Sequence, residues 1–329
     1  MRNAVIVSSG ASAPENIVPN SYFDDLLGVN VSDWLEEFVK IYNRRWVSED
    51  QSTVDLAYEA SVECLEGANV SPEDIDLIIL ATDTPEYISP STASVLQHKL
   101  GCVNAGTFDI NTACAGFVTA LDTGVKYIKS DENYNNVLVI GAYVMSKYLD
   151  KTDKKTVTLF ADGAGAVLLQ STSNEERGYK GSQLRTMGQY AGWMGIYGGG
   201  TRNPLSGEAV KNKEHKLKFV KKFPPEINPN TWSEMAKYLN TKTGKSSKEV
   251  DQYFLTQINI NSIWETMDIL DVPRDKAHTI MHEFGYTGSA CIPMAFHDAW
   301  QKGKVGKGDL VYFIGSGGGL AFASAAFVL

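Results

Sequence analysis

Short apolar runs of four or five residues recur along the chain and alternate with helical patterns. Runs of this length are typical of strands that are buried on both faces of a sheet. In the segment 56–65, apolar residues fall on one helical face, the pattern of a helix packed on a sheet. The pattern therefore predicts an α/β fold. The runs are AVIV at 4, LIIL at 77, VLVI at 137, VTLF at 157, AVLL at 166, LVYFI at 310 and AAFVL at 325.

The second half of the chain repeats part of the first. Residues 71–80 (SPEDIDLIIL) match residues 246–255 (SSKEVDQYFL) at an offset of 175, and residues 140–142 (IGA) match 314–316 (IGS) at an offset of 174. Recurrence of the offset across about 60 residues predicts a duplicated α/β unit with a pseudo-twofold axis.

The repeat predicts three parts of the chain. Residues 1–173 form an N-terminal half, residues 174–232 an excursion, and residues 233–329 a C-terminal half. The excursion is rich in Gly and Lys, and we expect it to cover the site or the mouth of a tunnel. Its GIYGGGT segment does not follow a strand and open a helix, so we do not interpret it as a dinucleotide loop.

Cys114 is the candidate nucleophile. An extended run ends at Asn111 and a helical pattern starts near Ala115, which places Cys114 in the turn between them. The positive end of a helix dipole stabilises a thiolate, so we expect the pKa of Cys114 to be lowered. Small neighbours leave room for a thioester. An isolated cysteine is more often a buried apolar residue, and we assign the cysteines without a strand-to-helix setting to packing: Cys64, Cys102 and Cys291.

Three other positions are expected near Cys114. Gly318 lies in a Gly-Gly-Gly run between two apolar runs, where a bare backbone can approach a ligand. A tight hairpin turn is compatible with this role, and we expect the N–H groups of Cys114 and Gly318 to form an oxyanion hole. The offset of 175 places Thr256 and Tyr286 at the ends of strands in the second half, and it pairs Cys114 with Ser289. Ligand sites gather at such strand ends.

The net charge and the spacing of the cysteines argue against several classes of protein. A net charge of −9 argues against general nucleic-acid binding, and four widely spaced cysteines indicate neither a metal site nor a disulfide scaffold. The N-terminal segment is too weakly apolar for a signal peptide or a membrane span, so we expect a cytoplasmic protein. Six lysines in residues 211–222 either attract an acidic carrier protein or coenzyme A phosphates, or form a solvated loop.

The segments DINTACAGF, LFADGAGAVLL and GGGLAFASA resemble, in order and spacing, three marked segments of ketoacyl-acyl-carrier-protein synthase III. The resemblance extends over nearly the whole chain. It implies a five-layered αβαβα thiolase fold, a homodimer, and acyl transfer onto Cys114 from coenzyme A or a phosphopantetheine-bearing acyl carrier protein, with no permanently bound cofactor. The loop around Ile88 matches the family region that reaches the partner's acyl pocket, which makes Ile88 a candidate for substrate binding.

The chain departs from that family at two catalytic positions. Thr256 stands where the family has a histidine and Tyr286 where it has an asparagine, although Asn259 keeps its place in the first motif. A hydroxyl donates one hydrogen bond but supplies no imidazole base. In the donor site Trp34 matches the family's tryptophan, whereas Phe38 replaces an arginine. A carrier-protein donor is then favoured over free coenzyme A.

These departures leave three hypotheses. In the first, Cys114 takes an acyl group from a thioester and passes it to an acceptor that needs little base assistance, in fatty-acid-like or secondary-metabolite biosynthesis. In the second, decarboxylative condensation persists with Thr256 and Tyr286 as donors, or with His282 in place of the missing histidine. In the third, the chain is a noncatalytic partner of an active ketosynthase, in a heterodimer rather than a homodimer.

Overall fold

The computed structural model describes residues 2–329, which build two mixed sheets of the same strand order. The first sheet runs β1 (Asn3–Ser12), β7 (Asp162–Thr172), β6 (Asn136–Val144), β4 (Leu77–Ala81) and β5 (Gly106–Ile110). The second runs β8 (Gly178–Thr186), β13 (Ala321–Val328), β12 (Leu310–Gly317) and β11 (Gln252–Leu255).

The two sheets also share their strand directions. β4 is parallel to β6 as β11 is to β12, and the remaining corresponding pairs are antiparallel. Residues 71–80 and 246–255 both form a 3-10 turn, η2 (Pro72–Asp74) or η5 (Ser247–Glu249), before their strand. The duplication predicted from the offset of 175 is therefore confirmed, and β5 is the strand by which the first sheet exceeds the second.

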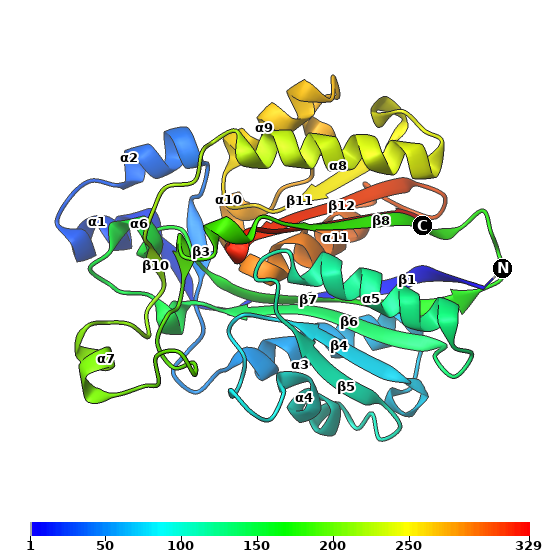
Figure 1. The fold of residues 1–329 in the computed structure, drawn as a ribbon, viewed down its shortest axis with the longest axis horizontal. Helices are drawn as coiled ribbons and strands as arrows, with labels where there is room; N and C mark the ends of the chain where they lie inside the picture. The colour runs from blue at the N-terminus through cyan, green and yellow to red at the C-terminus, as the bar shows by residue number, and fades with distance from the viewer. Residues whose placement is uncertain (1) are drawn as a thin grey trace.

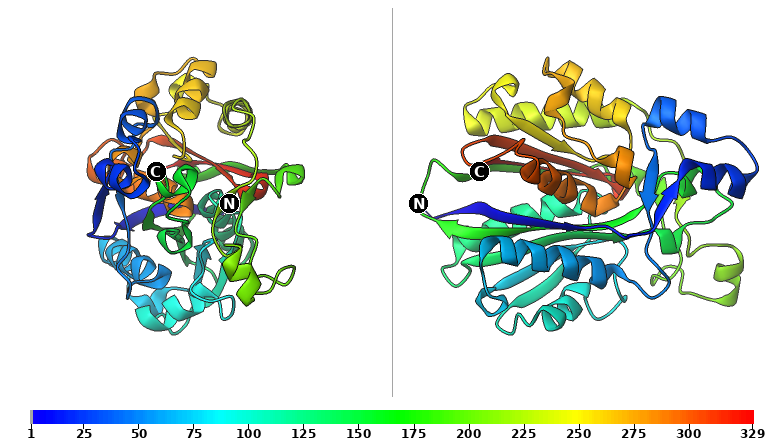
Figure 2. Two further views of the ribbon diagram at one scale, coloured as in Figure 1. Left: turned by 90° about the vertical axis from the view of Figure 1, so that its left-hand side faces the viewer. Right: turned by 180° about the vertical axis from the view of Figure 1, so that it is seen from behind.

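Helices complete five layers (Figures 1 and 2). Two of them, α5 (Gly116–Ser130) and α11 (Cys291–Gln301), contact strands of both sheets and form the middle layer. The outer layers are α3 (Thr53–Ala68) with α4 (Thr92–Leu100) on the first sheet, and α8 (Ile227–Thr243) with α9 (Ile260–Ile269) on the second. The predicted five-layered αβαβα thiolase fold is confirmed.

β4 shows why these strands are continuous apolar runs. Its five residues are all buried. Leu77, Ile79 and Ala81 pack into the core around α5, whereas Ile78 and Leu80 pack into the core beneath α3 and α4. Since successive side chains of a strand point to opposite faces, a strand between two helical layers needs apolar residues at every position.

The turn that precedes α11 holds the two halves together. It is η7 (Gly288–Ala290), the counterpart of the turn before α5, and it carries Ser289. Ser289 is fully buried, and its hydroxyl donates a hydrogen bond to the carbonyl oxygen of Ala142 in β6 over 2.8 Å. A Cβ atom at Gly141 would lie 2.2 Å from the carbonyl oxygen of Ser289. Only glycine fits at position 141 against this turn.

The excursion from the two main sheets is shorter than the span 174–232 that the repeat predicts. β8 lies within that span but belongs to the second sheet, so the chain leaves the sheets between 187 and 226. The sequence of β8 (GYKGSQLRT) mixes polar and small residues, so it shows no apolar run. The domain boundaries themselves stay a prediction. The excursion contains η4 (Gly188–Tyr190), β9 (Met194–Gly195), α7 (Gly207–Lys211) and β10 (Lys218–Phe219).

The remaining elements lie mainly at the end of the molecule opposite the termini (Figure 1). They are β2 (Ile17–Pro19), α1 (Asn20–Leu27), α2 (Ser32–Trp34), the π-helix η1 (Leu35–Val39), β3 (Asn43–Arg45), η3 (Ser146–Tyr148), α6 (Lys154–Val157), η6 (Arg274–Lys276), α10 (Met281–Phe284) and η8 (Gly318–Leu320). No helix in residues 2–329 is both long and apolar enough to span a bilayer.

Candidate active site

Cys114 lies in the turn between β5 and α5, where the sequence places it. β5 ends at Ile110 and α5 begins at Gly116. The turn is sharp, because Ala113 adopts a φ of 47°, a left-handed conformation that is uncommon for a residue with a side chain. The side-chain oxygen of Asn111 accepts a hydrogen bond from the N–H of Ala113 over 3.0 Å and supports this bend.

The glycine run 317–319 packs directly against this turn. A Cβ atom at Gly317 would lie 2.4 Å from the carbonyl oxygen of Thr112 and 2.6 Å from the backbone nitrogen of Cys114. At Gly318 the nearest atoms would be 3.6 Å away, an ordinary contact. The backbone of β12 can therefore approach the nucleophile only because residue 317 has no side chain.

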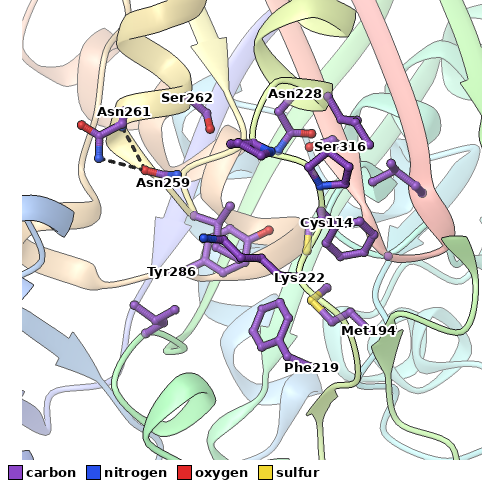
Figure 3. Close-up of a pocket in the computed structure, with 18 of the residues that line it drawn as sticks. Cys114, Met194, Phe219, Lys222, Asn228, Asn259, Asn261, Ser262, Tyr286 and Ser316 are labelled. Carbon is purple, nitrogen blue, oxygen red and sulfur yellow. Dashed lines mark hydrogen bonds between the residues drawn. The ribbon is translucent and has the colours of Figure 1, made fainter.

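Cys114 lies at the inner end of a cavity of about 480 Å³ (Figure 3). At the outer end of this cavity lie Trp34 and Phe38, which are 51% and 53% exposed. Six of the residues predicted for the site line this one cavity: Trp34, Phe38, Cys114, Asn259, Tyr286 and Gly318. The excursion supplies part of the wall through Met194, Phe219, Lys222 and Phe223, which sequence patterns did not identify.

Tyr286 is the side chain that engages the sulfur of Cys114. Its hydroxyl lies close enough to the Cys114 thiol to lower the pKa of that thiol. The ring is 1% exposed and lies 5.3 Å from the ring of Phe160, between centroids. The backbone is held as well, since the N–H of Tyr286 donates to Leu159 and its carbonyl oxygen accepts from Ala161. The hydroxyl is thus fixed in position before any substrate enters.

The pKa of Cys114 differs from the sequence expectation. Burial raises it well above its ordinary value, the carboxylate of Asp83 raises it further, and the hydrogen bond from Tyr286 lowers it only in part. The expected lowering by the dipole of α5 is therefore wrong in net direction. A thiol that is 2% exposed loses the hydration of its anion, and this cost exceeds the attraction of a helix end.

Thr256 lies behind the wall of the cavity. It is 1% exposed and absent from the lining. Its hydroxyl accepts a hydrogen bond from the N–H of Ser316 over 2.9 Å and approaches the Ser316 carbonyl oxygen at 3.3 Å. Thr256 thereby fixes the end of β12 next to the glycine run. Asn259 does line the cavity, but its side-chain oxygen caps α9 by accepting from the N–H of Asn261.

His282 and Ile88 lie outside the cavity. His282 is exposed on the short helix α10, and none of the cavity-lining residues in the described chain is a histidine. Ile88 is 87% exposed, in a loop beyond β4. The structure therefore places no imidazole beside Cys114.

Lysines 211–222 serve several intramolecular contacts. Lys213 pairs with Asp150 over 2.7 Å and Lys218 with Glu214 over 2.9 Å. Lys221 lies over the ring of Trp193, and Lys222 lines the cavity. Four of the six lysines are nevertheless exposed, so both interpretations of this segment stay predictions.

The other cysteines are buried, and in residues 2–329 no group of three or more His, Cys, Asp or Glu residues could hold a metal ion. Burial raises the pKa of Cys64 and Cys291 to about 12 and that of Cys102 to about 11. None of these three thiols lines the cavity. Their position, and not their pKa, distinguishes these thiols from Cys114, whose pKa is also raised.

Comparisons with known proteins bear on this site. Residues 108–188 match the family 3-oxoacyl-[acyl-carrier-protein (ACP)] synthase III, and residues 241–329 match its C-terminal part. The chain is similar to beta-ketoacyl-[acyl-carrier-protein] synthase III of Rhodopirellula baltica, at 36% identity over 99% of each chain, and of Clostridium perfringens, at 36% identity over 100% of each. The crystal structure of 3-oxoacyl-[acyl-carrier-protein] synthase III from Aquifex aeolicus covers 99% of this chain, and this chain covers 100% of it, with a TM-score of 0.90 and 30% identity.

Proposed function

This chain belongs to the 3-oxoacyl-[acyl-carrier-protein] synthase III family, and we propose that it is an acyltransferase that carries its acyl group on Cys114. The observation that carries the proposal is the position of the Cys114 sulfur. It lies in the wall of one cavity with the half-exposed Trp34 and with Tyr286, whose hydroxyl lowers the pKa of the thiol. A thioester entering at Trp34 would meet this thiol first among the four cysteines.

In this proposal the first step is thioester exchange. The sulfur of Cys114 attacks the thioester carbonyl, and the carrier thiol leaves. The N–H groups of Cys114 and Gly318 would donate to the oxygen of the tetrahedral intermediate, and an oxyanion hole of this kind is worth roughly 3 kcal/mol per donor. Their proximity supports the role, since Gly317 packs against the nitrogen of Cys114.

The acyl group then passes to an acceptor. With no imidazole in the cavity wall, suitable acceptors are an amine, an activated hydroxyl or a preformed carbanion. Tyr286 would stabilise the Cys114 thiolate that leaves, because its hydroxyl lowers the pKa of this thiol. Thr256 supports the site by holding Ser316 rather than by contacting substrate.

The experiment is intact-mass spectrometry after exposure to a panel of acyl thioesters of increasing chain length. We expect one acyl adduct on the wild type and none on Cys114→Ala. Cys291→Ala is the matched control, since Cys291 is equally buried but lies outside the cavity, and it should still be labelled. Labelling of Cys114→Ala at the wild-type level would overturn the proposal, and no labelling with any donor would favour a noncatalytic partner subunit.

For the donor we propose an acyl carrier protein rather than free coenzyme A. The mouth of the cavity offers aromatic surface at Trp34 and Phe38 and a cation at Lys222. The phosphopantetheine arm of a carrier protein could enter the cavity while the acidic protein stays outside. The phosphates on the nucleotide part of coenzyme A would meet a single cation, Lys222, among the residues that line the cavity. Comparison of kcat/KM for one acyl chain on either carrier tests this choice, and equal values would contradict it.

The chain's relatives favour a second candidate, decarboxylative condensation. The proteins of Rhodopirellula baltica and Clostridium perfringens are named beta-ketoacyl-[acyl-carrier-protein] synthase III. In this chain Tyr286 would then donate to the developing enolate or its carbonyl. Release of labelled carbon dioxide from a malonyl thioester, with an acyl primer on Cys114, would support this candidate. Acylation without any release would eliminate it.

For assembly we propose a homodimer. Two large apolar side chains are exposed in the loop that follows β4: Tyr87 at 54% and Ile88 at 87%. Adjacent exposed apolar residues of this kind mark interaction surfaces. A second copy of the same surface would cover them, and Ile88 could then reach the partner's acyl pocket.

A further inference from the structure

The carboxylate of Asp83 lies near Cys114 and takes no part in the steps proposed above. Asp83 follows β4 by two residues, and its Oδ1 atom is buried without a hydrogen-bond partner among the described residues. The residue as a whole keeps partial exposure. A buried carboxylate oxygen without a partner is costly for the fold, so its presence calls for an explanation.

Other buried carboxylates in the first half have clear structural partners. Asp162 accepts hydrogen bonds from the N–H groups of Val47 and Ser146 and from the Ser146 hydroxyl. Asp109 accepts from two N–H groups at the start of α4. No comparable network holds the side chain of Asp83. A purely structural role therefore fits those two residues but not Asp83.

The path of the chain places Asp83 on the face of the first sheet that carries Cys114. Leu77, Ile79 and Ala81 of β4 face α5, so continuing the alternation by one step turns Asp83 to the same side. A Cβ atom at Gly116, two residues after Cys114, would lie 3.0 Å from the Cβ of Ala81. The end of β4 and the nucleophile turn are thus in contact.

The neighbours of Asp83 in the chain hold it in this place. The N–H of Thr82 donates to the carbonyl oxygen of Ile110 at the end of β5, and the hydroxyl of Thr84 accepts from the N–H of Val144 at the end of β6. The segment is therefore fixed between the strand that leads to Cys114 and the strand that carries Tyr143. Asp83 itself does not line the cavity, so it would act on the Cys114 thiol from the side of β4.

The electrostatics match this placement. Burial raises the pKa of Asp83 to about 6. After burial itself, the charge of Asp83 is the largest cause that raises the pKa of both Cys114 and Tyr143, and it also raises that of Tyr148. These thiol and phenol groups are neutral near pH 7, and the other carboxylates that act on the same phenols are Asp162, on Tyr143, and Glu86, on Tyr148.

The geometry points to Asp83 as the general base of the acyl transfer, a role that rests on the proposed function of Cys114. In the first step the carboxylate takes the proton of the Cys114 thiol as sulfur attacks the thioester, and it returns this proton to the sulfur of the leaving carrier. In the second step it takes the proton of the acceptor and delivers it to the Cys114 sulfur as the acyl bond to it breaks. No proton or electron is gained or lost overall.

Two reactions of the Cys114 thiol distinguish a general base at Asp83 from a negative charge that only lies nearby. Alkylation by iodoacetamide needs only the thiolate, so Asp83→Asn should accelerate it several-fold near pH 7 by removing a nearby negative charge. Acylation needs the proton acceptor, so the same variant should lose about a hundredfold or more in rate. A simple charge effect would accelerate both reactions, whereas a structural defect that exposed the site would also open the other buried cysteines, such as Cys291, to alkylation.

The test measures both rates for the wild type, Asp83→Asn and Asp83→Glu, with Glu86→Gln as the matched control on the same loop. We expect partial rescue by Asp83→Glu and wild-type rates for Glu86→Gln. Acylation of Asp83→Asn at or above the wild-type rate would overturn the role of Asp83 while leaving acyl capture by Cys114 intact. If no donor acylates the wild type, the proposed function itself fails instead.

The wild-type pH profile provides a measurement that needs no variant. As a base, Asp83 must be ionised, so the acylation rate should rise through about pH 6, near the pKa of this carboxyl. The alkylation rate depends on the Cys114 thiolate and not on a base. It should therefore show no inflection near pH 6 like the one expected for the acylation rate. An acylation rate that is flat from pH 5 to 7 would contradict the inference even if Asp83→Asn does not fold.

Discussion

The hydroxyl of Tyr286 lowers the pKa of the Cys114 thiol beside it, and the two residues come from opposite halves of a duplicated fold. Tyr286 precedes α11 and Cys114 precedes α5, the two helices of the middle layer. The candidate site is therefore assembled only where the halves meet. Removing the hydroxyl changes the chemistry of the thiol without changing the shape of the cavity.

Tyr286→Phe should raise the pKa of Cys114 further. A hydrogen bond to a charged group contributes about 1.5–3 kcal/mol, which corresponds to about one or two pKa units. The alkylation rate with iodoacetamide near pH 8 should then fall about tenfold or more, opposite in direction to Asp83→Asn. Phenylalanine keeps the contact with Phe160, so the melting temperature should change little.

The control for this variant is Tyr253→Phe. Tyr253 is also fully buried, but its hydroxyl donates to the carbonyl oxygen of Ser247, away from the cavity. Its removal should affect stability and leave the alkylation rate of Cys114 unchanged. Equal alkylation rates for wild type and Tyr286→Phe would show that the hydrogen bond does not act on the thiolate.

Gly317→Ala should disrupt the nucleophile turn, whereas Gly318→Ala should be tolerated. The added methyl would meet Thr112 and Cys114 backbone atoms at 2.4 and 2.6 Å in the first variant, but nothing closer than 3.6 Å in the second. Overpacking of this kind costs about 1–3 kcal/mol. Thermal unfolding together with acylation of Cys114 measures the difference, and similar behaviour of the two variants would show that the contact yields easily.

Asp83→Asn should stabilise the fold more at high pH than at low pH. Burial raises the pKa of Asp83 from 3.8 to about 6, so the ionised form destabilises the fold, and this cost grows as pH rises from about 4 to about 6. Allowing for partial exposure, the gain should be about 1–3 kcal/mol at pH 8 and about half of that at pH 5. Urea unfolding at the two pH values provides the measurement.

Asp150→Asn is the control for that measurement, because it should change the free energy of unfolding in the opposite direction. Partial burial raises the pKa of Asp150, but hydrogen bonds from Lys213 and Thr152 outweigh it and lower the pKa to about 2. The carboxylate of Asp150 therefore stabilises the fold above about pH 4, and this contribution is lost as pH falls through about 2. Its replacement should decrease stability at pH 5 and pH 8 alike. A gain at either pH would show that the pairing with Lys213 contributes nothing.

Ile88→Asp should convert a dimer into monomers. The side chain is 87% exposed in the single chain, and a charge there would have to be buried against a second copy. Sedimentation velocity at micromolar concentration measures the change. Leu205→Asp is the matched control, because Leu205 is a 60% exposed apolar residue far along the excursion, and it should leave the sedimentation coefficient unaltered. A wild type that sediments as a monomer would contradict the homodimer.

Local patterns predicted the parts of the site that depend on backbone form. The apolar runs predicted the buried strands β4 and β12, and the change from an extended to a helical pattern between Asn111 and Ala115 predicted the turn at Cys114. These two signals lie within a few neighbouring residues. Tyr286 was placed near Cys114 by the offset of 175, a signal that comes from the duplication.

Other features depend on contacts between distant segments. Thr256 stands at a strand end as predicted, but its hydroxyl turns toward Ser316 because that backbone passes beside it. β8 carries no apolar run, and the pairing with β13 alone makes it a strand. Asp83 left one signal, an acidic residue two positions after a buried apolar run. That signal has meaning only once Cys114 is known to face the same side of the sheet.

Duplication supplied this fold with two turns of one kind, and they have diverged. Ser289 occupies the position that corresponds to Cys114, yet its hydroxyl is fully buried and bonded to Ala142. It joins the two halves and is closed to any substrate. The loading stoichiometry follows: a chain built from two equivalent units has capacity for a single acyl group, and its dimer for two.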